Sequence, residues 1–159
     1  MTIPAGTATG TYYVIAKADG ANVVSEVTET NNTKYSTAIK IGPDLTVSAL
    51  TVPTSAKIGA TISITDTTKN IGAEDAGAST TKFYFSTNSA FDGNDTYLGS
   101  RDIPTLIAST TNSGSTSVTI PAGTATGTYY IIAVADADNV IAELTETNNT
   151  YARSISIVP

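Results

Sequence analysis

The sequence contains no cysteine, no histidine and no tryptophan. Without cysteine there is no disulfide, no zinc–thiolate centre and no thiol nucleophile. Without histidine the Ser-His-Asp and Cys-His catalytic systems are excluded, together with the most common proton shuttle. The carboxylates that remain lie in predicted turns and strand edges, where they are normally ionised and solvated. We therefore predict that the protein is not an enzyme.

Basic residues and long apolar runs are also scarce. Eight Lys and Arg residues face 14 Asp and Glu residues, which gives a net charge of −6. An acidic surface repels phosphate groups, so we expect no nucleic-acid partner. No run of 18 apolar residues occurs, and we expect no membrane insertion. Helical periodicity is likewise missing, and the many threonines favour strands.

A long internal repeat organises the chain. Residues 3–13 recur letter for letter as residues 120–130, and over residues 3–33 and 120–150 the two copies are identical at 24 of 31 positions. A period of this length fits a string of whole domains rather than a solenoid. We predict a complete repeat over residues 43–159. Residues 1–42 then form the C-terminal strands of a preceding repeat, a partial module within a longer exported protein.

Short alternating segments separated by turn residues predict about seven strands in the complete repeat. Residues 128–135 are almost continuously apolar, as in a central strand. This pattern predicts an all-β fold, an immunoglobulin-like antiparallel β-sandwich, with a barrel as the weaker alternative. The predicted strands cover residues 45–52, 58–64, 82–86, 96–99, 116–120, 128–135 and 155–157. An extended segment is predicted at 140–144, between the last two of these strands.

Several motifs in one order resemble a known family. They are Asp44-Leu-Thr-Val, Lys69-Asn-Ile-Gly, Phe83-Tyr-Phe-Ser-Thr, the Asp92 to Gly99 loop, Gly127-Thr-Tyr-Tyr, and the segment from Asp136 to Asn149. Together they are similar to the CARDB module, the cell-adhesion-related domain found in bacteria. The resemblance implies an immunoglobulin-like sandwich in tandem arrays on extracellular or cell-surface proteins. It implies no common ligand, so the host, matrix or glycan partner of the parent protein stays open.

Residues 92–96 are a candidate calcium loop. Asp92, Asn94 and Thr96 have the spacing of the first ligands of such a loop, and Asp95 adds a carboxylate. However, Tyr97 and Ile103 stand where an EF-hand has its Gly and its Glu. A solvent-exposed turn explains the same residues, because Asp, Gly and Asn are turn formers. Both interpretations remain open, and calcium is the only cofactor we consider.

A second acidic set follows the predicted central strand. Asp136, Asp138 and Glu143 are candidate ligands of a cation at a junction between modules, although the first copy has Ala21 in place of Asp138. The alternative is a hairpin turn followed by an edge strand that charges protect from aggregation. The Asn148-Asn149 pair nearby is expected to adopt the left-handed backbone of a tight turn.

The uneven repeat suggests how the protein associates. The chain holds the last strands of a sandwich twice and the first strands once, so one set lacks a partner within the chain. Unpaired strand edges add to other chains. We expect residues 1–42 to dock on the sandwich or to exchange with another copy or a neighbouring repeat. The predicted function is a spacer or adhesion module, with a self-assembling filament subunit and a carbohydrate-binding module as the alternatives.

Overall fold

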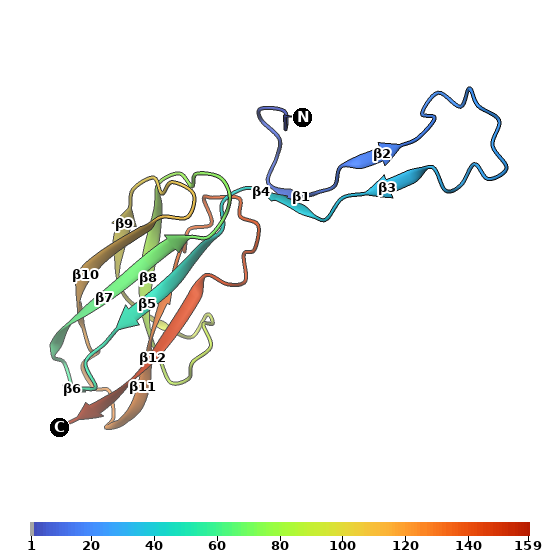
Figure 1. Cartoon of the computed structure of the whole chain (residues 1–159). Coiled ribbons are helices and arrows are strands. Elements are labelled where there is room, and N and C mark those ends of the chain that lie inside the picture. The colour runs from blue at the N-terminus through green and yellow to red at the C-terminus, as the bar shows by residue number, and fades with distance from the viewer. Residues whose placement is uncertain (1) are drawn as a thin grey trace.

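The computed structural model describes residues 2–159, which form twelve strands and no helix. Eight strands build a sandwich, and four short strands form a hairpin that projects from one end of it (Figure 1). No helix of the described residues is long and apolar enough to cross a membrane. The sandwich strands are β5 (Leu45–Thr51), β6 (Ser55–Lys57), β7 (Thr61–Asn70), β8 (Ser79–Ser86), β9 (Thr96–Ile103), β10 (Thr111–Thr119), β11 (Gly127–Val134) and β12 (Thr150–Val158).

The two sheets of the sandwich have three and five strands. The smaller sheet has the order β10-β7-β5, and the larger has the order β6-β12-β11-β8-β9. All pairs are antiparallel except the parallel pair of β12 with β6. The sequence prediction of an all-β sandwich is therefore confirmed, and β11 is a central strand as its apolar composition predicts.

The core lies between the sheets because each strand turns alternate residues inward. On β8, Phe83 and Phe85 share the inner face, as their spacing predicts. On β7, Ile62 and Ile64 face them from the other sheet. Phe83 is the largest of the fully buried side chains. Burial of these side chains is the main stabilising contribution to the sandwich.

Two details of the strand prediction are wrong. Ile58 lies outside any strand and is 40% exposed, because the chain turns at Gly59, whose φ of +71° suits glycine. The segment 140–144 is a loop rather than an extended strand. It leaves the sheet because Asp136 and Asn139 adopt positive φ values of 40° and 51°. The sandwich has eight strands where about seven were expected, because the short strand β6 (Ser55–Lys57) was not predicted.

Residues 2–42 form a separate hairpin. The strands β1 (Gly10–Tyr12) and β4 (Ile39–Ile41) pair with each other, as do β2 (Ile15–Lys17) and β3 (Thr33–Tyr35). None of the four pairs with a sandwich strand. The hairpin extends away from the sandwich in Figure 1, so in this structure it is not docked on the sandwich faces.

The hairpin joins the sandwich through a closely packed junction centred on Asn70. Its side-chain Oδ1 accepts hydrogen bonds from the Asp44 and Gly72 amides at 3.2 and 3.0 Å. Its Nδ2 donates to the carbonyls of Glu74 and Leu106 at 2.7 and 3.1 Å. Asn70 is fully buried, and these four bonds use the full capacity of its amide in fixing the start of β5.

Candidate functional site

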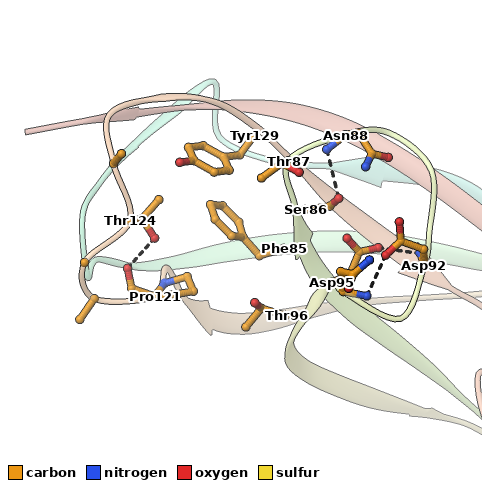
Figure 2. A pocket seen from close by; sticks show the side chains of 14 residues that line it. Phe85, Ser86, Thr87, Asn88, Asp92, Asp95, Thr96, Pro121, Thr124 and Tyr129 are labelled. Carbon is orange, nitrogen blue, oxygen red and sulfur yellow. Dashed lines mark hydrogen bonds between the residues drawn. The ribbon is translucent and has the colours of Figure 1, made fainter.

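A groove at one end of the sandwich contains the first predicted site. It lies between the loop from β8 to β9 and the loop from β10 to β11 (Figure 2). Asp92, Asn94, Asp95 and Thr96 all line this groove, so the structure brings the four candidate calcium ligands together. Pro121 and Thr124 face them from the opposite loop.

Hydrogen bonds within the loop hold its carboxylates. Asp92 Oδ1 accepts from the amide of Asn94 at 2.7 Å, and Asp95 Oδ2 accepts from the amide of Asp92 at 2.9 Å. Such side-chain to backbone bonds are what makes Asp a turn residue. The loop geometry therefore has a local explanation that does not require an ion, and one oxygen of each carboxylate is free of these bonds.

Aromatic side chains form the floor of the groove. Phe85 and Tyr129 stack with ring centroids 4.7 Å apart and planes inclined by 18°. Tyr129 and its neighbour Tyr130 are both partly buried, and Tyr129 is the one that packs against the core, as alternation along a strand predicts.

The residues of the second acidic set have three separate partners. Asp136 accepts hydrogen bonds from the amides of Val140 and Ile141 at 3.2 and 2.8 Å. Asp138 pairs with Lys82 of β8 and raises the pKa of that ammonium group. Glu143 bonds the start of β5. Within residues 2–159, no three acidic side chains converge where they would hold a metal ion.

Glu143 connects the loop after β11 to the first strand of the sandwich. Its Oε2 accepts from the amide of Leu45, and its Oε1 accepts from Asn149 Nδ2 at 3.1 Å. The side chain is buried, and this burial raises its pKa to about 7. The negative charges of Glu146 and Asp136 act in the same direction, while the two hydrogen bonds oppose them. At neutral pH the group is therefore close to half protonated.

The asparagine pair also contributes to this docking, in a way that differs from the sequence prediction. Neither Asn148 nor Asn149 has positive φ; the left-handed residues are Asp136 and Asn139 at the start of the loop. Asn148 instead donates to Asp44 Oδ1 at 2.8 Å and accepts from Thr46 Oγ1 through its carbonyl. The predicted edge strand is absent as well, because residues 135–149 form this docked loop.

Sequence reasoning missed an ion pair inside the sandwich. Arg101 of β9 donates to Asp66 of β7 through Nε at 2.9 Å and through a terminal nitrogen at 2.7 Å. The Asp66 side chain is completely buried and that of Arg101 is 14% exposed. Asn112 also contacts Arg101. The two-pronged geometry is the strong form of this interaction and joins the two sheets.

The two-sheet fold and the docked loop of residues 135–149 define an immunoglobulin-like β-sandwich module. The CARDB family model matches residues 42–153, so the chain belongs to the CARDB family. No curated protein matches the chain.

Three solved structures illustrate the likeness. The CARDB domain of the PF1109 protein of Pyrococcus furiosus, in complex with di-metal ions, is 23% identical; the match covers 74% of this chain and 90% of that one, with a TM-score of 0.57. A domain of a proposed cell surface protein of Methanosarcina acetivorans is 22% identical over 74% of this chain and 94% of that one, with a TM-score of 0.50. A β-glucosidase of Listeria innocua is 12% identical over 72% of this chain and 16% of that one, with a TM-score of 0.50. At these identities the structures show the fold alone.

Proposed function

We propose that the protein is a non-catalytic spacer module of a cell-surface protein, which holds a neighbouring domain at a distance. Membership of the CARDB family and the likeness to a domain of a proposed cell surface protein support this function. The observation that carries it is the position of the two ends of the sandwich. The chain enters the sandwich between β4 and β5, beside the hairpin, and its C-terminal end lies at the opposite end of the sandwich (Figure 1).

A module that the chain enters at one end and leaves at the other adds its full length to a row of modules. The longest strand, β7, has ten residues, which corresponds to roughly 33 Å at about 3.3 Å per residue. The entry side is held stiffly, since the carbonyl of Gly42 accepts from the amide of Ala73 at 3.1 Å and the carbonyl of Asp44 accepts from Ile71 at 2.7 Å. These contacts fix the direction of the segment that precedes the sandwich.

Small-angle X-ray scattering on engineered tandem arrays tests the proposal. Arrays of two, three and four copies of residues 43–158 would be compared, each internal junction carrying Val158→Gly to reproduce Gly42. We expect the maximum dimension to rise by a constant increment of roughly 35 Å per copy. A matched array with a four-residue Gly-Ser insertion at each junction should be shorter and more heterogeneous. Equal dimensions for the two series, or arrays that fold back on themselves, would contradict the spacer function.

A further inference from the structure

The projecting hairpin of residues 2–42 carries a large apolar surface that is exposed to solvent. Val27 is fully exposed and Ile15 is 57% exposed, whereas Ile132, the counterpart of Ile15 in the sandwich, is fully buried. An exposed surface of this kind marks an interaction site. Its large apolar members are Ile3, Tyr12, Tyr13, Ile15, Val23, Val24, Val27 and Tyr35.

The loop of the hairpin at residues 19–24 already has the conformation of its counterpart in the sandwich, residues 136–141. Asp19 and Asp136 are equivalent in the repeat, and both have φ of 40°. Both also bind two amides of their own loop, in the case of Asp19 at 3.0 and 2.9 Å. Asn22 and Asn139, again equivalent, have φ of 55° and 51°. The loop conformation therefore depends on local bonds, and this part of the binding surface is formed before anything docks on it.

The second copy of the hairpin shows what such a surface binds. In the sandwich, the amide of Leu144 donates to the carbonyl of Pro43 at 2.9 Å, and Glu143 accepts from the amide of Leu45. The loop residues thus hold the beginning of β5. The strand β11 of this second hairpin pairs with β8, and its residues Ile131 and Ile132 are fully buried.

The equivalent groups of the first hairpin surround an open groove. Glu26, Val27 and Asn31 correspond to Glu143, Leu144 and Asn148, and they line this groove with no strand seated in it. The amide of Glu26 is held by Glu29 Oε1 at 2.9 Å, as the amide of Glu143 is held by Glu146 at 3.0 Å. The groove therefore has the shape and the hydrogen-bonding groups for a segment of the Pro43-Asp-Leu-Thr46 type.

We propose that the open face of hairpin 2–42 binds a second set of first strands built like residues 43–118, which it completes into a sandwich. The start of the strand equivalent to β5 would enter the groove beside Glu26 and Asn31. The strand equivalent to β8 would pair with the outer edge of β2. Such a partner resembles residues 43–118, which bind the second copy of the hairpin in this structure.

The test places a copy of residues 43–118 directly before Thr2 of the full chain, so that it continues into Ile3 as Val118 and Thr119 continue into Ile120. Hydrogen exchange is then measured on the amides of residues 13–17. We expect it to slow by about 100-fold or more in the fusion relative to the chain alone, as these amides enter a folded unit. Unchanged exchange would overturn the proposal.

Matched variants separate docking from nonspecific protection. Val14 lies outside the existing sandwich and corresponds to the fully buried Ile131. In the fusion, Val14→Asp should remove the protection of residues 13–17, while Val14→Ile should keep it; in both, the sandwich of residues 43–159 should melt as before. Protection that survives Val14→Asp, or that rises with protein concentration in the unfused chain, would show another occupant and overturn the proposal.

Discussion

Glu143 accepts a hydrogen bond from the backbone amide of Leu45, a residue 98 positions earlier in the chain. The bond connects the loop before the last strand, β12, to the first residue of β5, the first strand of the sandwich. A buried carboxylate that accepts a backbone hydrogen bond is charged at high pH and neutral at low pH, and the two forms differ in stability here because burial raises its pKa to about 7. The burial of this carboxyl group at the contact therefore links the closure of the sandwich to pH.

The first prediction concerns this pH dependence. The pKa of Glu143 is raised in the folded state from an ordinary value near 4.5 to about 7, so its contribution to stability is fully present below about pH 4.5 and is lost as the pH rises through about 7. A shift of this size corresponds to a change on the order of 3 kcal/mol. We expect urea unfolding at pH 5 and pH 8 to show the sandwich less stable at the higher pH.

Glu143→Gln supplies the control for this effect. The glutamine carbonyl can still accept from Leu45, and its amide can donate to Asn149 Oδ1, which is buried and has no partner, once the Asn149 side chain rotates. The variant should lose most of the difference between pH 5 and pH 8. The same substitution at the exposed neighbour, Glu146→Gln, should keep most of it. A full pH difference in Glu143→Gln would show that another group is responsible.

The second prediction concerns the Asp66–Arg101 pair. Arg101→Met leaves the Asp66 carboxylate buried without its partner, and we expect the free energy of unfolding to fall by roughly 3–5 kcal/mol. The double variant with Asp66→Asn should recover a large part of this loss, because no charge is left buried. Denaturation with urea for all four combinations gives the coupling between the two residues.

The exposed pair Lys82–Asp138 is the comparison for that experiment. Its lysine lies at the surface, where solvent screens the interaction. Lys82→Met should therefore leave the unfolding transition almost unchanged. Equal losses in Arg101→Met and Lys82→Met would mean that the buried pair has no special role in joining the two sheets.

The fold class was predictable because the inner residues follow simple periods. Phe83 and Phe85 alternate as in a strand with one buried face, and residues 128–135 are almost continuously apolar because β11 is a central strand with neighbours on both sides. The acidic turn at residues 92–96 was predictable for a similar reason, since its hydrogen bonds connect neighbours in the sequence.

The long-range polar contacts were not predictable in the same way. Asp66 and Asn70 continue the alternation of Ile62 and Ile64, so a strict period of two does place them on the inner face. Nothing in the local pattern, however, identifies Arg101 as the partner of Asp66 or Leu45 as the partner of Glu143. Such pairs depend on which strands become neighbours, and that is decided by the packing of the whole sandwich.

The third prediction concerns the junction at Asn70. Asn70→Ala removes four hydrogen bonds and leaves their buried partners unsatisfied, so we expect a loss on the order of 3 kcal/mol. Asn70→Asp should be at least as destabilising, because an acceptor oxygen then faces the carbonyls of Glu74 and Leu106. Thermal unfolding measures both. Asn94→Ala, in an exposed loop, should change the stability by less than about 0.5 kcal/mol, and a similarly small effect at residue 70 would contradict the assigned role.

The fourth prediction concerns calcium at the groove. The amides of Asn94 and Asp92 already close the loop through the carboxylates of Asp92 and Asp95, so we expect the same melting temperature in millimolar calcium and in chelator. An ion bound to the folded state at 100 times its dissociation constant would stabilise it by about 2.7 kcal/mol, a shift that calorimetry resolves. If the melting temperature does rise, Asp92→Asn and Asp95→Asn should abolish the rise, while Asp102→Asn, which removes the same charge from the exposed side of β9, should not. Such a result would establish Asp92 and Asp95 as cation ligands and the groove as a site whose occupancy sets the stability of the module.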